Sequence, residues 1–199
     1  MHLSDVPMLF IRTGSDYVDA RGQTFRNFLQ TGKLASGEKR TPSLNHWVDH
    51  LTTLFPEVRV KRVLELRGAD VVPLPQMIAL PALWVGILYD PQACEAAFRL
   101  TQSWTFPQRL DFQGEVVRSA LQARGPDGRT ALELGRELVG IAKKGLAGWA
   151  RQTGIDERAH LEPLDDILAS GRTLAERAVD AYRESGWDPE ALVKFWQVA

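Results

Sequence analysis

The sequence has few of the features that assign a function at first sight. It contains one cysteine, Cys94, in 199 residues, so an internal disulfide framework is impossible. Its 24 Lys and Arg stand against 25 Asp and Glu. They are spread along the chain and do not form the positive patch that nucleic acids attract. We therefore expect no nucleic-acid partner.

Long apolar runs and a leader-like stretch are also missing. The longest apolar run, residues 77–89, is interrupted by Pro81 and falls short of the roughly 18 residues that a membrane span needs. Residues 1–7 have neither the basic nor the apolar region of a secretory signal. We expect no membrane partner and a cytoplasmic location. Cys94 lies in an amphipathic helical pattern, residues 91–98, which predicts a buried structural thiol.

The first part of the chain mixes strand and helix patterns. Two short apolar runs, residues 7–12 and 17–20, flank turn-forming residues 13–16 and predict a β-hairpin. Residues 24–30 and 41–54 predict two helices, the second with a proline in its first turn.

From about Pro75 onward the pattern is helical. Two capping boxes mark helix starts, one formed by Thr130 and Glu133 and the other by Thr173 and Glu176. Strand patterns followed by helix patterns predict an α+β fold with helices gathered against a sheet.

The clearest strand pattern covers residues 58–67. One face carries Val58, Val60, Arg62, Leu64 and Leu66, and the other carries Arg59, Lys61, Val63, Glu65 and Arg67. The strict period of two predicts one strand, and at about 3.3 Å per residue its polar face would extend over roughly 27 Å.

This polar face has two interpretations. Its cations and carboxylate suit an anionic ligand with a divalent metal, because guanidinium groups bind phosphate and carboxylate while Mg²⁺ prefers carboxylate oxygens. The alternative is a solvated face with alternating charges, and the pattern alone favours it. Gly68, directly after the pattern, would let a ligand or another backbone approach closely.

A resemblance changes this balance. Residues 50–70 read HLTTLFPEVRVKRVLELRGAD, which resembles the most characteristic stretch of the plant and proteobacterial glutamate–cysteine ligases. Further similar segments occur in the same order, at residues 5–8, 17–19, 23–26, 79–90, 163–166 and 169–173. The resemblance therefore covers nearly the whole chain and outweighs the solvated-face interpretation.

The resemblance implies an activity and a fold. Members of this family join the γ-carboxylate of glutamate to the amine of cysteine, the first step of glutathione synthesis. The reaction uses ATP and Mg²⁺ and passes through a γ-glutamyl phosphate. The fold is similar to that of glutamine synthetase, in which helices surround a curved antiparallel sheet. We expect residues 1–199 to form a single domain, the C-terminal half of the catalytic domain. It would have a partial sheet in residues 1–70 and a mainly helical region in residues 75–199.

The same similarity implies site residues. Glu65 is expected to be a Mg²⁺ ligand, and Arg67 a contact to substrate carboxylate or to the transferring phosphate. Arg59 is a further candidate for phosphate or substrate binding. Lys61, on the same face, is expected to act with Arg67 in catalysis.

Family members are more than twice as long, so we expect the chain to be inactive without an N-terminal half, supplied in the same or a separate polypeptide. The open edge of a divided sheet also predicts dimerisation. Leu9, Val63 and residues 71–76 depart from the family pattern. They leave two alternatives, a non-catalytic homologue or a related carboxylate–amine ligase with a different acceptor.

Two histidines are four residues apart, His46 and His50, a spacing that can bind zinc on one helix face. Zinc normally needs three or four ligands, and no third ligand is near in sequence. A packing role for these histidines is the favoured prediction.

Overall fold

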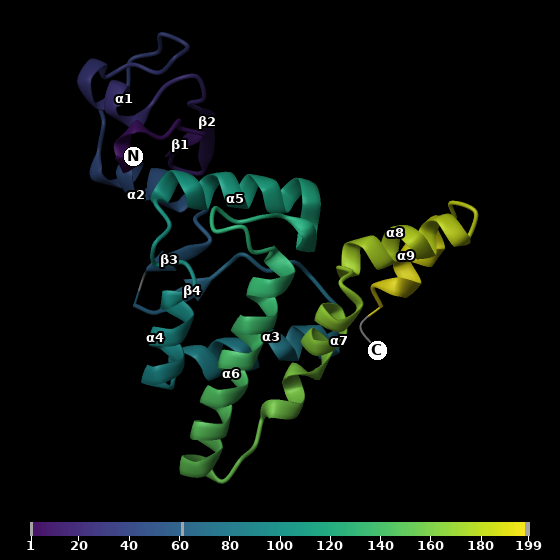
Figure 1. Ribbon diagram of the computed structural model, residues 1–199. Helices are drawn as coiled ribbons and strands as arrows, with labels where there is room; N and C mark the ends of the chain where they lie inside the picture. Colours follow the sequence, from purple (N-terminus) through teal and green to yellow (C-terminus); the bar gives the residue numbers. More distant parts are fainter. Residues whose placement is uncertain (1, 61, 198–199) are drawn as a thin grey trace. The chain divides into compact units, whose positions relative to one another are not determined.

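The computed structural model describes residues 2–60 and 62–197, which belong to two compact units, Met1–Asp70 and Val71–Ala199 (Figure 1). The first unit contains η1 (Leu3–Asp5), β1 (Phe10–Thr13), β2 (Asp16–Asp19), α1 (Phe25–Thr31), α2 (Leu44–Thr52), β3 (Val58–Val60) and β4 (Leu64–Leu66). The second contains α3 (Leu74–Leu88), α4 (Pro91–Arg99), α5 (Phe106–Ser119), η2 (Ala120–Gln122), α6 (Ala131–Thr153), η3 (Arg158–Leu161), α7 (Glu162–Ser170), α8 (Leu174–Glu184) and α9 (Pro189–Phe195). Antiparallel strands followed by helices confirm the predicted α+β class. The prediction of a single domain stays a prediction.

The predicted N-terminal hairpin is confirmed, with a tighter turn. β1 and β2 pair in antiparallel register from Phe10 opposite Asp19 to Thr13 opposite Asp16. Two residues therefore connect the strands, and Gly14 adopts a φ of 63° that is unfavourable for residues with a Cβ. Apolar residues from this hairpin, from α1 and from the loop after it form a small core, made of Met8, Ile11, Ala20, Phe25, Phe28 and Leu34.

Local capping explains where α2 begins. The helix starts at Leu44, three residues after the predicted start, because the Ser43 hydroxyl accepts a hydrogen bond from the His46 backbone N–H and so acts as the N-cap. His50 on this helix is 1% exposed. Its ring stacks on Phe25 with centroids 5.0 Å apart, and its Nε2 lies 3.1 Å from the Leu3 carbonyl oxygen. His50 thus packs in the core of the first unit.

The prediction of one strand over residues 58–67 is wrong. The segment forms two three-residue strands, β3 and β4, that pair with each other in antiparallel register. The alternation of side chains between two faces is the same in a hairpin as in a single strand, so the period of two did not reveal the reversal.

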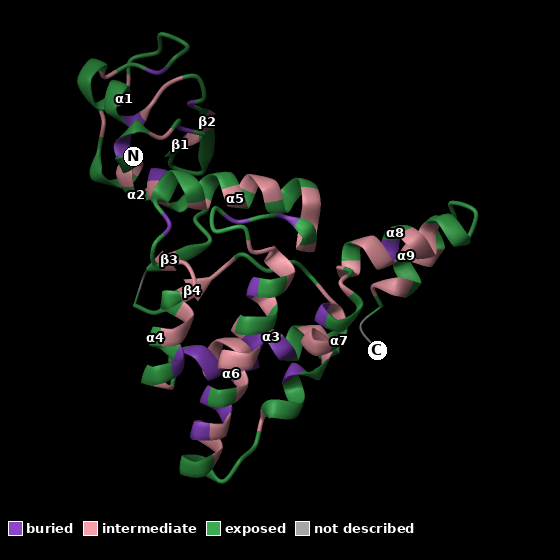
Figure 2. Cartoon of the chain, viewed as in Figure 1, coloured by how far each residue is buried: buried purple, intermediate pink, exposed green. Residues whose placement is uncertain are grey.

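A close crossing of α3 and α6 organises the second unit. The buried residues of its core come from these helices, η3 and α7 (Figure 2), and are Ala82, Ile87, Val139, Ala142, Leu146, Leu161 and Leu168. At the crossing, Gly86 faces the backbone of Ala142, and a Cβ on Gly145 would overlap the carbonyl oxygen of Gly86. Small residues therefore let two backbones touch, which brings the flanking apolar side chains into contact.

Side-chain caps begin several of these helices. Both predicted capping boxes are confirmed, at the N-termini of α6 and α8. A third, not predicted from the sequence, is formed at α5 by Thr105 and Gln108.

Cys94 is exposed, so the prediction of a buried thiol is wrong. Helix α4 does form, but Ala93 and Ala97 are the residues that face the core. The neighbouring position is rotated by about 100° around the helix axis and points to solvent.

Among the helices of the described residues, none is both long and apolar enough to cross a bilayer alone. The pair α3 and α4 together meets the length and composition required, but the two helices are bent by 98° at their junction.

We expect Gly145→Ala to lower the free energy of unfolding by about 2–3 kcal/mol, because the added methyl group overlaps the backbone of α3. Gly140→Ala is the matched control in the same helix, where nothing lies within 4 Å of an added Cβ. It should leave stability unchanged or raise it by up to about 1 kcal/mol through helix propensity. Urea unfolding of the full chain measures both. Equal effects would contradict the close crossing.

Candidate functional site

The charged face of the β3–β4 hairpin is the candidate site, because it brings three of the predicted residues together. Register places Arg59 on β3 directly opposite Glu65 on β4. In a single strand these residues would be about 20 Å apart at 3.3 Å per residue. Arg67 follows two positions after Glu65 and lies on the same face, and its backbone N–H continues the ladder to the Glu57 carbonyl oxygen at 2.8 Å.

Arg59 and Glu65 form a bidentate ion pair. Nε of Arg59 donates to Oε2 of Glu65 at 2.8 Å, and Nη2 donates to Oε1 at 3.0 Å. The Arg59 side chain is 22% exposed and that of Glu65 is 37% exposed, so the pair is accessible to solvent. Parallel N–H···O contacts of this kind are stronger and more directional than contacts made by lysine.

Arg67 is held in a different way. Its guanidinium carbon lies 5.2 Å from the centroid of the Phe55 ring, a cation–π contact, and its Nε is 3.7 Å from Oε1 of Glu65, too far for a hydrogen bond. Nη1 of Arg67 is enclosed, and no residue that the structure describes accepts a hydrogen bond from it. An enclosed guanidinium N–H without an acceptor is costly, so this nitrogen is suited to an anionic oxygen of a ligand.

One of these features was missed from sequence. Phe55 contacts Arg67 only because the chain folds back, and nothing in the strand pattern indicates that contact. Gly68 was singled out for close approach, and an added Cβ there would overlap the Glu57 carboxylate. Lys61, predicted to act in catalysis, lies outside the described residues.

The donor set fits a metal ion only in part. Within residues 2–60 and 62–197, no three His, Cys, Asp or Glu residues lie close enough together to hold one. Mg²⁺ in nucleotide sites often uses one or two carboxylates, with substrate phosphates and water as its other ligands. Glu65 could be such a carboxylate if Arg59 gave up at least one of its oxygens, so its metal role stays a prediction.

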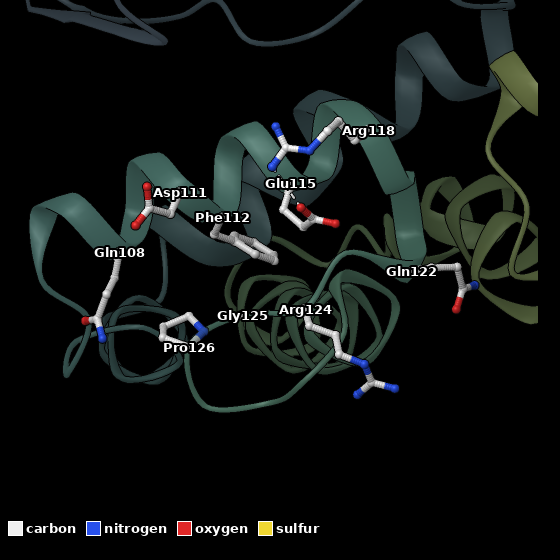
Figure 3. A pocket seen from close by; sticks show the side chains of 9 residues that line it. All are labelled: Gln108, Asp111, Phe112, Glu115, Arg118, Gln122, Arg124, Gly125 and Pro126. Carbon is white, nitrogen blue, oxygen red and sulfur yellow. Dashed lines mark hydrogen bonds and ion pairs between the residues drawn. The ribbon is translucent and has the colours of Figure 1, made fainter.

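A cavity of about 740 Å³ lies between α5 and the loop that precedes α6 (Figure 3). Charged residues line it, but Glu115 pairs with Arg118 and Ser119, and Gln108 caps the start of α5. Glu115 and Gln108 therefore serve local structure, and the chemistry expected of an active site is better represented in the hairpin.

The loop that lines this cavity is held by an aspartate clamp, which consists of Asp127 and its hydrogen-bond donors Trp104 and Arg129. Asp127 accepts hydrogen bonds from Trp104 Nε1 at 3.2 Å and from Arg129 Nη2 at 2.7 Å. The Arg129 guanidinium, followed by the Arg129 backbone N–H and Trp104, lowers the pKa of Asp127 below its usual 3.8. Gly125 lies against the Trp104 ring, where a side chain would not fit.

Comparison with known proteins decides the family. The family model described as glutamate-cysteine ligase family 2 matches residues 2–193. The chain belongs to this family. Among similar glutamate–cysteine ligases, ligase A, chloroplastic, of Oryza sativa subsp. indica is 39% identical over 183 residues, which are 92% of this chain and 36% of that protein. The chloroplastic ligases of Medicago truncatula and Arabidopsis thaliana are each 40% identical over 178 residues, 89% of this chain and 34% and 33% of those proteins. The chain spans about a third of the length of the ligases it matches.

These relatives also correct one prediction. Each of the three ligases is named as chloroplastic. The predicted cytoplasmic location is therefore contradicted. It had rested on the composition of residues 1–7 and on the lack of a long apolar run, and neither feature distinguishes the cytoplasm from the interior of an organelle.

The clamp of this ligase-family chain gives a pH prediction. The folded state lowers the pKa of Asp127. The contribution of the Asp127 carboxylate to the stability of the folded chain is therefore complete above pH 3.8 and is lost as pH falls through the lowered pKa. Asp127→Asn should cost about 1–2 kcal/mol at pH 7, and the variant should lose less stability than the native chain between pH 6 and pH 3.

Urea unfolding at both pH values measures the effect. Asp111→Asn, an exposed carboxylate lining the same cavity, is the control and should follow the native chain. An Asp127 variant with the full native pH dependence would contradict the clamp.

Proposed function

We propose that this chain supplies part of the active site of a ligase that joins the γ-carboxylate of glutamate to the amine of cysteine with ATP. Membership of the family supports the ligase class. The observation that supports a role in substrate binding is the enclosed Nη1 of Arg67, which has no acceptor among the described residues. An anionic oxygen, from the glutamate carboxylate or from the transferring phosphate, would satisfy it.

The hairpin would orient this anion through Arg67. Phe55 covers one face of the Arg67 guanidinium, and Glu65 lies beside its Nε. The guanidinium group is therefore held in place before a ligand binds. Preorganised donors of this kind stabilise charge that develops during acyl and phosphoryl transfer. Arg59 and Lys61 are proposed as further contacts to substrate or phosphate.

Mg²⁺, when bound, would neutralise phosphate charge and polarise the oxygens of the transferring group. We propose Glu65 as the residue of this chain that holds it, because a single carboxylate together with phosphate oxygens is a usual Mg²⁺ environment. ATP and Mg²⁺ are proposals for the assembled enzyme.

The hairpin also supports a need for further polypeptide. Its apolar face is open, with Val58, Val60 and Leu64 exposed by 47%, 77% and 59%. Two strands with a bare apolar face are marginal without additional strands or a covering layer. We propose that the remainder of the ligase, in the same or a separate polypeptide, provides this cover. Dimerisation through the same face stays a prediction.

Glu65→Gln tests the proposal in the assembled ligase, formed by combining this chain with the remaining part of a family enzyme. Loss of the carboxylate charge should lower kcat by about 10²- to 10³-fold and leave folding unchanged. ADP release in the presence of glutamate and cysteine measures the rate. Glu38→Gln, which changes an exposed carboxylate of the first unit, is the control and should keep normal activity.

Other outcomes would favour the alternatives. ADP release only with a different amine would identify a related carboxylate–amine ligase. A folded, assembled protein that releases no ADP with any amine would identify a non-catalytic homologue. Near-normal activity of Glu65→Gln would exclude Glu65 from metal binding.

A further inference from the structure

Arg59 is a cation that already occupies the Glu65 carboxylate. Both oxygens accept a hydrogen bond from the Arg59 guanidinium, at 2.8 and 3.0 Å. A metal ion that binds Glu65 directly must come within about 2.1 Å of an oxygen. The two cations therefore compete for the same lone pairs, and at least one Arg59 contact must break before a metal ion can bind.

The pair is placed where such an exchange is feasible. Neither side chain is fully buried, with exposed fractions of 22% for Arg59 and 37% for Glu65. Ion pairs at this degree of exposure are weak, since water replaces the lost contacts. A deeply buried pair would be too costly to open.

Arg67 is less suited to exchange. Its Nε lies 3.7 Å from Oε1 of Glu65, so it makes no hydrogen bond that a metal would have to break, and Phe55 holds its guanidinium by stacking. Of the two arginines, Arg59 is the one whose hydrogen bonds would change when a metal ion binds the Glu65 carboxylate.

We propose that Arg59 is an exchangeable partner of Glu65, which it holds when no metal ion is present and releases when a divalent cation binds. This proposal rests on the metal role of Glu65 in the proposed function. The hairpin cluster of Arg59, Glu65 and Arg67 carries one net positive charge by itself. A divalent cation would raise that charge by two and free a guanidinium with five N–H donors. Metal binding would thereby prepare the cluster for a polyanion such as a nucleotide triphosphate.

The test measures binding of Mn²⁺, a paramagnetic substitute for Mg²⁺, to the ¹⁵N-labelled full chain. Broadening of the backbone amide signals of residues 57–60 and 64–67 reports a metal ion at the hairpin even when binding is weak. Arg59→Met removes the guanidinium and keeps an unbranched apolar stem. It should tighten Mn²⁺ binding at the hairpin by about three- to fivefold, the upper range of what one exposed ion pair is worth.

Two further variants locate the effect. Glu65→Gln should abolish the broadening at the hairpin, both alone and combined with Arg59→Met. Arg21→Met is the matched control, because Arg21 forms an exposed bidentate pair with Asp19 in the same unit and its loss changes the net charge equally. It should alter Mn²⁺ affinity at the hairpin by less than about twofold, since exposed charges at a distance are screened.

The outcomes separate this proposal from the one it rests on. Equal or weaker Mn²⁺ binding by Arg59→Met, with binding still lost in Glu65→Gln, would overturn the exchange and leave the metal role standing. Broadening that Glu65→Gln does not remove would overturn both. If the amide chemical shifts show that Arg59→Met disrupts the hairpin, Arg59→Lys replaces it. An ammonium cannot hold both oxygens in the fork geometry, so this variant should tighten Mn²⁺ binding by about two- to threefold, and no tightening would overturn the exchange.

Discussion

The candidate site depends on the bidentate contact between Arg59 and Glu65. The two strands that carry them have three residues each, and a ladder of this length has little stability of its own. A charged pair directly across the ladder favours one register, because a slip by one residue would place charged side chains on the apolar face. The position of Arg67 follows from that register, since it is the next residue on the face of Glu65.

The sequence predicted the faces of this segment correctly and its path incorrectly. Arg59, Glu65 and Arg67 share a face in both cases, because alternation survives a chain reversal. The reversal itself had no signal, since residues 61–63 read Lys-Arg-Val and contain none of the residue types that mark turns. The two helix starts marked by capping boxes, at α6 and α8, were predicted correctly, because a cap is a contact between residues only three positions apart.

Features that depend on contacts between distant residues could not be predicted from local patterns. The stacking of Phe55 on Arg67 and the enclosed Nη1 exist only after the chain folds back. The direction in which Cys94 points depends on the contact between α4 and α6, where Ala93 meets Gly145. The chain also spans about a third of its relatives' length.

The outward direction of Cys94 has a practical consequence. It is the sole thiol of the chain and lies on the surface of the second unit, so a maleimide reagent would modify one known position without any engineered change. A nitroxide or fluorophore attached there would report from the second unit alone. Its distance from a probe in the first unit would show, by electron spin resonance or energy transfer, whether the two units hold one mutual orientation in solution or sample several.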